Sequence, residues 1–200
     1  MQLNKNSEDS IPLKGRLFVV SGPSGAGKGT LVSAALEMLP NLTLSVSATT
    51  RNPRPGEVEG VNYHFKSDQE FDELISTDGL LEWARVHQHR YGTLKDQVNR
   101  ALSEGQDLIL EIDLQGYRQI RDHDNEVISV FVAPPTLEEL ERRLVHRGTE
   151  SKESIEQRLC TARVEMEAKD SYTVVIVNDD YETAAKELVD FIDENKTKEQ

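Results

Sequence analysis

Cysteine is nearly absent from this sequence, since Cys160 is the only one among 200 residues. A single thiol can form neither an intramolecular disulfide nor a zinc site built from cysteines alone. None of the five histidines has metal-ligand spacing with it. Nothing beside Cys160 in the sequence indicates an activated thiol, so we interpret it as a small buried apolar residue.

The sequence also lacks a long apolar run. No segment approaches the ~20 apolar residues of a membrane-spanning helix. The first ten residues have no apolar core of the kind that a signal peptide carries. We therefore expect a cytoplasmic protein with no membrane partner, and we interpret residues 1–14 as a flexible N-terminal tail.

Positive charge is scarce as well. Lysine and arginine together number 23 against 36 aspartates and glutamates, which gives a formal net charge of −13. Broad binding to nucleic acid would need a positive field, so we expect no nucleic-acid partner. A site for an anion must instead be local and built from a few arginines. Three sets stand out: Arg51 with Arg54, Arg142 with Arg143, and Arg147 with Arg158.

Short apolar runs rich in valine and isoleucine recur along the chain, with helix-like segments between most of them. This alternation predicts an α/β fold, with a parallel five-stranded core sheet and helices on both faces. The predicted strands are Leu17–Val20, Leu42–Val46, Leu108–Ile112, Val127–Val132 and Thr173–Val177.

Two segments interrupt this alternation. Residues 49–64 are polar and rich in proline and glycine, and a short strand, a short helix and another strand at Leu80–Val86 are expected to follow. This pattern predicts an inserted subdomain. The second segment, residues 146–153, is a charged link between two helices, of a kind that could serve as a mobile lid.

A glycine-rich sequence follows the first predicted strand and opens a helix. It reads Gly22-Pro23-Ser24-Gly25-Ala26-Gly27-Lys28-Gly29-Thr30. The glycines let successive backbone N–H groups point inward, and the N-terminus of the next helix attracts anionic oxygens. Lys28 adds a positive charge for the β- and γ-phosphates of a nucleotide. The alternative is a flexible glycine-serine turn, which would not require a lysine directly after Gly27.

The side chains that could support a magnesium ion depart from the usual pattern. The residue after the lysine is normally Ser or Thr, but here Gly29 intervenes and the hydroxyl belongs to Thr30, about 100° further round the helix. Glu111 and Asp113 lie at the C-terminal end of a predicted strand, where a parallel sheet presents residues to its ligand. One acid of this pair would suffice for Mg²⁺, and Asp113 is our candidate for its water shell. The alternative is a solvated strand end.

A second site for a phosphate is indicated between residues 45 and 65. Arg51 and Arg54 stand three apart in a loop stiffened by Pro53 and Pro55, and Tyr63 follows. Two guanidinium groups and a phenol make a multidentate site for a phosphate. Alone, the same segment is equally compatible with an ordinary solvated basic loop.

Longer motifs make the sequence resemble the guanylate kinase family from about Gly15 to about Leu188. The first motif is Ser45-Val-Ser-Ala-Thr-Thr-Arg-x-Pro-Arg-x-Gly-Glu57. It is followed in order by Gly60-Val-Asn-Tyr-His-Phe65, Leu81-Glu-Trp-Ala84, Tyr91-Gly-Thr93, Glu111-Ile-Asp-Leu-Gln-Gly116 and Arg147-Gly-Thr-Glu150. Several long motifs that agree in order and spacing are more specific than any one of them.

The resemblance implies a GMP site. It assigns the phosphate of GMP to Arg51, Arg54, Tyr63 and Tyr91, and the guanine to Ser47, Glu82 and Thr93, with Glu111 and Asp113 placed in the same site. Guanine presents N1–H and the N2 amine as adjacent donors, which one carboxylate can accept together, whereas adenine lacks this pair. Read alone, Glu82 would more often be an exposed strand residue.

The resemblance also implies an ATP site and a lid. ATP would bind the sequence Gly22–Thr30, with Asn178 near the adenine. Arg147 and Arg158 resemble the lid arginines of the family, so the catalytic set becomes Lys28, Arg51, Arg147 and Arg158. Arg142 either joins them or forms a helix-surface ion pair with Glu138 or Glu139.

These expectations define a P-loop nucleoside monophosphate kinase architecture with Mg²⁺ as cofactor. The core would comprise residues 15–44, 94–145 and 157–195, the GMP-binding insert about 45–93 and the lid about 146–156. The expected reaction is ATP with GMP or dGMP to give ADP with GDP or dGDP. Two alternatives remain: a catalytically silent interaction module of the same fold, and a kinase for another nucleotide. Soluble members of this family are often dimers or larger, so a homo-oligomer stays open.

Overall fold

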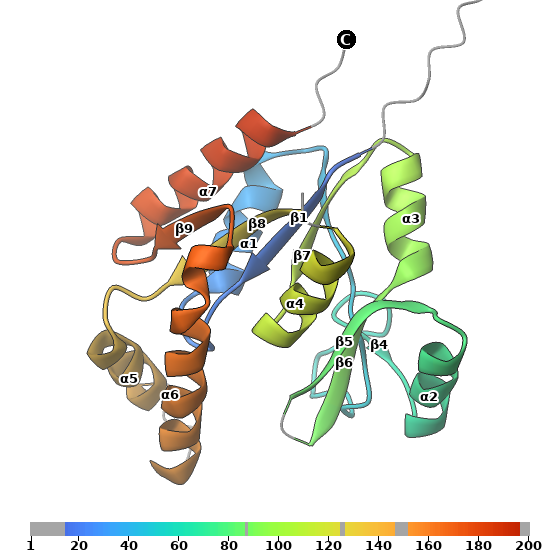
Figure 1. Cartoon of the computed structure of the whole chain (residues 1–200), viewed down its shortest axis with the longest axis horizontal. Helices are drawn as coiled ribbons and strands as arrows, with labels where there is room; N and C mark the ends of the chain where they lie inside the picture. The colour runs from blue at the N-terminus through green and yellow to red at the C-terminus, as the bar shows by residue number, and fades with distance from the viewer. Residues whose placement is uncertain (1–14, 87, 125–126, 147–151, 197–200) are drawn as a thin grey trace, which may run out of the picture.

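Five parallel strands form the central sheet of the computed structural model, which describes residues 15–86, 88–124, 127–146 and 152–196. Their order across the sheet is β2-β7-β1-β8-β9 (Figure 1). The predicted parallel sheet is therefore confirmed, with all five strands at the predicted places. The strands are β1 (Leu17–Ser21), β2 (Leu42–Leu44), β7 (Asp107–Glu111), β8 (Ile128–Ala133) and β9 (Val174–Val177).

Helices cover both faces of this sheet because alternate residues of each strand point to opposite sides. Phe18 and Val20 of β1 pack with α1 (Lys28–Met38) and α7 (Tyr181–Asn195). Val19, between them, packs on the other side with α3 (Lys95–Ser103) and α4 (Leu114–His123). Figure 1 shows the two helix layers on either side of the sheet. The ends of β1 and β7 are thus held rigidly next to the start of α1.

A second, four-stranded sheet is formed by the segment that was predicted to be an insert. Its order is β4-β3-β6-β5, and the hairpin of β5 and β6 is antiparallel. The strands at β4 and β5 agree with the prediction, whereas β3 and β6 were not predicted. The elements are β3 (Ala48–Thr49), β4 (His64–Phe65), α2 (Asp68–Ser76), β5 (Leu80–Val86) and β6 (His89–Leu94).

The small sheet has its own core, centred on Phe71 of α2. Phe71 and Ala48 are fully buried, and Leu80 is buried beside them. The guanidinium carbon of Arg90 lies 4.8 Å from the centre of the Phe71 ring. Arg90 also donates to the carboxylates of Asp68 and Asp72, which ties β6 to α2. Because so few apolar residues form this core, each contributes a large share of its stability.

The helices α5 (Leu137–His146) and α6 (Lys152–Glu167) lie beside the sheet on the side of β8 and β9 (Figure 1), and the 3₁₀ turn η1 (Lys169–Ser171) follows. Ile155, Leu159 and Ala162 of α6 pack against α5. Cys160, however, is exposed. Our interpretation of it as a buried residue was wrong, because Cys160 is the residue next to Leu159 and points away from the packed stripe.

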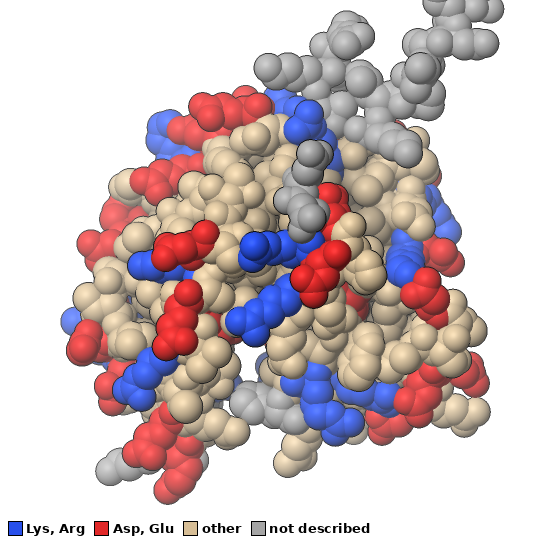
Figure 2. All heavy atoms as spheres, in the orientation of Figure 1, with Lys and Arg blue, Asp and Glu red and all other residues tan. Residues whose placement is uncertain are grey.

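Several predicted features lie outside the described residues. These are the N-terminal tail at residues 1–14, Arg147 and most of the link predicted to be a lid. In the described part of the chain, no helix is long and apolar enough to cross a membrane. Acidic and basic side chains are interleaved over the face seen in Figure 2, which shows no large basic field.

We expect Phe71→Ala to lower the free energy of unfolding by about 3–5 kcal/mol, the usual cost of deleting a buried aromatic ring. Val61→Ala is the matched control, because Val61 belongs to the same segment and is 67% exposed. It should change stability by less than about 0.5 kcal/mol. Urea unfolding followed by circular dichroism measures both, and equal stabilities of the two variants would contradict a separate core under the small sheet.

Candidate active site

The phosphate loop, residues 22–27, joins the end of β1 to the start of α1. Gly27 has a φ of 93°, and a Cβ there would lie 2.3 Å from Nδ2 of Asn178. Glycine is required here by both backbone conformation and space. Because α1 has no acidic residue in its first turn, the positive end of its dipole is left for an anion.

Asn178 lies beneath this loop and braces it. Its side chain is buried, and Nδ2 donates to the carbonyl oxygen of Ala26 at 2.7 Å. Nη2 of Arg143 in turn donates to the backbone oxygen of Asn178 at 3.0 Å. The predicted contact of Asn178 with adenine stays a prediction. The contact that the structure adds is with the backbone of the loop.

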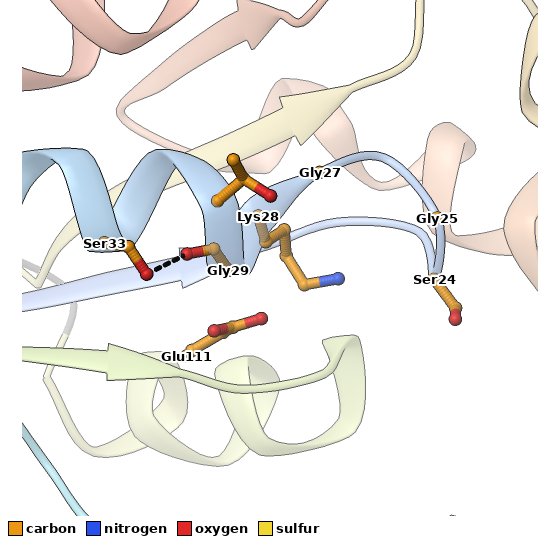
Figure 3. Close-up of a pocket in the computed structure, with 8 residues that line it drawn as sticks. Ser24, Gly25, Gly27, Lys28, Gly29, Ser33 and Glu111 are labelled. Carbon is orange, nitrogen blue, oxygen red and sulfur yellow. Dashed lines mark hydrogen bonds between the residues drawn. The ribbon is translucent and has the colours of Figure 1, made fainter. Parts of the chain in front are cut away.

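A cavity of about 550 Å³ lies over the loop, and we call it the loop cavity. Nζ of Lys28 donates to the carbonyl oxygens of Gly22 at 2.6 Å and Pro23 at 3.1 Å. Figure 3 shows this side chain between the loop and the carboxylate of Glu111, which faces it from the end of β7. The cavity is lined by Ser24, Gly25, Gly27, Lys28, Gly29, Thr30, Ser33 and Glu111.

The two acids near the end of β7 occupy different environments. The carboxylate of Glu111 is exposed and lines the loop cavity with the hydroxyl-bearing residues Thr30 and Ser33. Asp113 instead caps α4, because Oδ1 accepts from the backbone N–H of Gly116 at 2.9 Å and Oδ2 accepts from the side chain of Gln115 at 3.0 Å. Glu111 is therefore better placed than Asp113 to support a cation beside bound phosphates.

Among the described residues, no group of three or more His, Cys, Asp or Glu side chains is placed to hold a metal ion. One carboxylate and one hydroxyl on the rim of an anion site nevertheless suit Mg²⁺, which keeps several waters and takes further oxygens from phosphates. The donor set at Glu111 and Thr30 thus fits magnesium when it arrives with a nucleotide.

A second cavity, of about 660 Å³, adjoins the first, and we call it the central cavity. Ser24, Lys28 and Glu111 line both cavities. Its walls come from the core, from the hairpin of β5 and β6, and from α6, and Figure 2 shows the surface hollowed between the last two. Of the predicted site residues, it is lined by Gly22, Ser24, Lys28, Ser47, Arg54, Tyr63, Glu82, Tyr91, Glu111, Asp113 and Arg158.

Arg51, Arg54, Tyr63 and Tyr91, the arginine clamp, are brought together as predicted. The guanidinium carbon of Arg51 lies 5.2 Å from the centre of the Tyr63 ring, and the centres of the Tyr63 and Tyr91 rings are 5.9 Å apart. Arg54, Tyr63 and Tyr91 line the central cavity, and the guanidinium of Arg51 lies over the Tyr63 ring next to them. The clamp therefore presents one guanidinium and two phenols to the cavity, with a second guanidinium against the ring of one of these phenols.

Glu82 is a buried carboxylate in the wall of the central cavity. It is 4% exposed, and Oε1 accepts a hydrogen bond from Oγ1 of Thr93 at 2.7 Å. Burial raises the pKa of Glu82 to about 7, against the opposing effect of the Thr93 hydroxyl. A Cβ on Gly116 would lie 2.2 Å from Oε2 of Glu82, so the room for this carboxylate depends on a glycine in α4. Such a group can accept two parallel donors from a ligand.

The predicted lid arginines have three different outcomes. Arg158 of α6 reaches the phosphate loop, where Nη1 donates to Oγ of Ser24 at 3.2 Å. Arg142 is exposed and forms an ion pair with Glu139, which is the surface alternative left open by the sequence. Arg147 lies outside the described residues. Arg158 alone therefore joins the described site from this set.

Sequence reasoning missed Glu165, a buried acid that lines the central cavity from α6. It is 8% exposed, and burial raises its pKa to about 7 although Lys28 opposes the shift. A signal was present in the sequence, because Arg158, Thr161 and Glu165 have the helical spacing that places them on one face. All three line the central cavity. Polar residues in that pattern indicate a helix face that lines a polar, solvent-accessible cavity.

The comparisons with known proteins agree with this geometry. The family model described as "Guanylate kinase" matches residues 14–195. A guanylate kinase of Synechococcus sp. (strain JA-3-3Ab) is 54% identical over 175 residues, which cover 88% of this chain and 81% of that protein. A guanylate kinase of Caldanaerobacter subterraneus subsp. tengcongensis is 48% identical over 179 residues, which cover 90% and 87%.

A solved structure shows the same similarity in three dimensions. The crystal structure of guanylate kinase from Anaplasma phagocytophilum superposes with a TM-score of 0.75 at 32% sequence identity. The match covers 92% of this chain and 88% of that one. The similarity therefore includes the small sheet as well as the core.

We expect Glu82→Gln to stabilise the protein increasingly as pH rises from 5 to 8. The pKa of Glu82 in the folded chain, about 7, lies above its ordinary value of 4.5, so folding favours the protonated acid. The stability that this contributes is present below pH 4.5 and is lost as pH rises through about 7. The neutral glutamine escapes this loss and should gain up to about 3 kcal/mol at pH 8.

Melting temperatures recorded across this pH range measure the effect. Glu37→Gln is the control for a change of charge alone, because Glu37 is exposed on α1. A difference between Glu82→Gln and the wild type that does not change with pH would contradict the raised pKa.

Proposed function

Because this chain belongs to the guanylate kinase family, we propose that it transfers a phosphoryl group from ATP to GMP or dGMP, giving ADP with GDP or dGDP. The observation that carries the proposal is Glu82, a buried carboxylate beside a clamp of arginines and tyrosines, in a cavity that adjoins the phosphate loop. The residues proposed to bind the acceptor base, the acceptor phosphate and the donor phosphates thus lie around two adjoining cavities.

ATP is expected in the loop cavity, with its phosphates in the phosphate loop. The N-terminus of α1 and the backbone N–H groups of the loop attract the phosphate oxygens. Lys28 lines both cavities, so its ammonium group is placed to follow the transferred phosphoryl group from one substrate to the other. Asn178 acts on ATP through the backbone of the loop that it braces.

GMP is expected in the central cavity, with its phosphate on the arginine clamp and its base against Glu82. The ionised carboxylate accepts N1–H and the N2 amine of guanine. The hydroxyl of Ser47, which lines the cavity, is the candidate donor to O6, because the hydroxyl hydrogen of Thr93 is already donated to Glu82. Adenine would leave the buried Glu82 without its donors, which is costly in a desolvated site. Thr93 also holds Glu82 in place through its hydrogen bond.

The transfer itself needs alignment and neutralisation of charge rather than a general base. An oxygen of the GMP phosphate is already anionic at neutral pH, and it attacks the γ-phosphorus of ATP. The bond from that phosphorus to the bridging oxygen breaks, and ADP leaves with the electron pair. Lys28, Arg51 and Arg158 are the described cations proposed to stabilise the charge on the transferred group, and Arg147 is assigned to the same set by family resemblance.

Magnesium is the expected cofactor, and Glu111 and Thr30 are the residues that would support it, with Asp113 acting through the cap of α4. When bound with ATP, Mg²⁺ neutralises charge on the phosphate oxygens. Glu111 and Thr30 would contact its water shell, so the protein contributes orientation more than direct ligands.

We assign the core to residues 15–44, 94–145 and 157–195, the GMP-binding insert to about 45–93 and the lid to about 146–156. Closure of the insert and lid over the substrates would exclude water from the transfer. A cytoplasmic location and a homo-oligomer are further expectations of the same proposal. The silent interaction module is the weaker alternative, because such a module has no need of Lys28, the arginine clamp and Arg158 around one cavity.

We expect ADP release with ATP to be fastest with GMP and dGMP and at least about 100-fold slower with AMP, UMP and CMP, because only guanine satisfies Glu82. A coupled assay of ADP release across these five acceptors measures the preference. Lys28→Ala should abolish turnover while GMP binding, followed by calorimetry, remains. Equal rates with all five nucleotides would contradict the proposal, and binding of GMP without turnover would favour the silent module.

We expect Glu111→Gln to raise the magnesium concentration needed for half-maximal rate by about tenfold, as is common for groups that orient a bound metal. Asp113→Asn is the matched comparison, because Oδ1 of Asp113 already caps α4 and Oδ2 already accepts from the side chain of Gln115. It should leave the magnesium requirement within about twofold of the wild type. Titration of the initial rate with MgCl₂ measures both, and the opposite order would assign the metal to Asp113.

A further inference from the structure

One carboxylate links the two arginines of the clamp. Oε1 of Glu57 lies 2.8 Å from Nη2 of Arg51, and Oε2 accepts from the backbone N–H of Arg54 at 2.7 Å. The backbone N–H of Glu57 donates back to the carbonyl oxygen of Arg54 at 3.0 Å. Residues 51–57 thus form a closed turn around the side chain of Glu57.

These contacts fix the guanidinium of Arg51 in one position. Nη1 donates to the carbonyl oxygen of Asn52 at 2.8 Å, and the guanidinium lies over the Tyr63 ring. The side chain of Arg51 is 11% exposed. Of the five N–H groups of an arginine, the contacts to Glu57 and Asn52 use two and a hydrogen bond with Tyr91 uses a third, which still leaves donors for a ligand. The hydrogen bond between the two side chains of Arg51 and Glu57 raises the pKa of Arg51 and lowers the pKa of Glu57.

A carboxylate at this position has an electrostatic cost. Its negative charge opposes the approach of a phosphate and offsets part of the attraction of Arg51. Without it, however, the long side chain of Arg51 would sample many rotamers, and the backbone of residues 51–57 would lose a hydrogen bond. Binding would then have to order these groups, which lowers affinity. Glu57 therefore favours phosphate binding if the ordering of the clamp contributes more to the binding free energy than the negative charge of Glu57 costs.

We propose that Glu57 is a positioning residue for the phosphate of the acceptor nucleotide. It holds the guanidinium of Arg51 and the backbone of Arg54 as one preformed clamp, so that both arginines meet the phosphate together. The inference rests on the proposed function for the identity of the ligand as GMP. Glu57 acts through the two arginines and does not itself contact the substrate.

Glu59 provides a matched control within the same loop. Its Oε2 accepts from the backbone N–H of Phe65 at 2.7 Å, and its Oε1 lies 3.1 Å from Nδ1 of His64. Like Glu57, it closes a turn by accepting a backbone N–H and pairing with a side chain. Neither of these partners, His64 or Phe65, is an arginine of the clamp. Replacing Glu59 therefore tests the effect of loosening the loop while the clamp is left intact.

The test compares Glu57→Gln and Glu57→Ala with Glu59→Gln and Glu59→Ala by steady-state kinetics and by calorimetry of GMP binding. We expect Glu57→Ala to raise KM and Kd for GMP by about tenfold or more, the usual effect of losing a hydrogen bond to a charged group. Glu57→Gln should have a smaller effect, because its amide can accept from only one of the two partners. KM for ATP should stay within about twofold and kcat should fall less than KM rises.

The Glu59 variants should keep KM for GMP within about threefold of the wild type. Circular dichroism and melting temperature identify any variant that fails to fold, and the glutamine variants then carry the comparison. Equal effects at positions 57 and 59 would overturn the proposal, because they would show a general loosening of the loop. Tighter GMP binding by Glu57→Ala would also overturn it, because charge would then outweigh order.

The calorimetric measurement separates this inference from the proposed function. If the wild type binds GMP without turning it over, the proposed function fails and the effect of Glu57 on binding is still measured. If the wild type turns over GMP and the Glu57 variants bind it normally, the positioning role fails alone.

Discussion

Bringing two anions into contact is the physical constraint on which the rest of this structure depends. ATP and GMP repel each other, and the chain itself carries a formal charge of −13. The cations that offset this repulsion are not spread over the surface. Lys28, Arg54 and Arg158 come from the core, the small sheet and α6, and all three line the central cavity. The fold concentrates a few positive charges at the point where three elements meet.

The acids near this point can be tolerated because each is tied to a separate task. Glu57 is neutralised by Arg51. One oxygen of Asp113 caps the N-terminus of α4, and the other accepts from the side chain of Gln115. Glu82 and Glu165 are buried, and burial raises the pKa of each to about 7, so a good fraction of each is neutral near physiological pH. A substrate that offers hydrogen-bond donors to Glu82 favours its ionised form, so base recognition and protonation are coupled.

Local patterns in the sequence were enough to predict the five core strands and the phosphate loop. A buried parallel strand and a glycine-rich loop are each encoded by neighbouring residues. The two-residue strand β3 could not be predicted, since its existence depends on pairing with β4 and β6. The support of the loop by Asn178 joins residues 152 positions apart, and no local pattern reveals it. The prediction that Cys160 is buried was wrong because a single helix position separates a packed residue from an exposed one.

Contacts between the core and the small sheet set the position of Glu82, the residue that we propose recognises the base. Glu82 belongs to β5, but the room for its carboxylate is provided by Gly116 of α4. Gln119, one turn further along α4, accepts from the backbone N–H of Trp83 at 3.2 Å and donates to its carbonyl oxygen at 2.7 Å. The strand is thus held on the helix through its backbone, directly beside the carboxylate. Any motion of the small sheet that breaks this contact also moves Glu82, so recognition of the base and the position of the insert are mechanically linked.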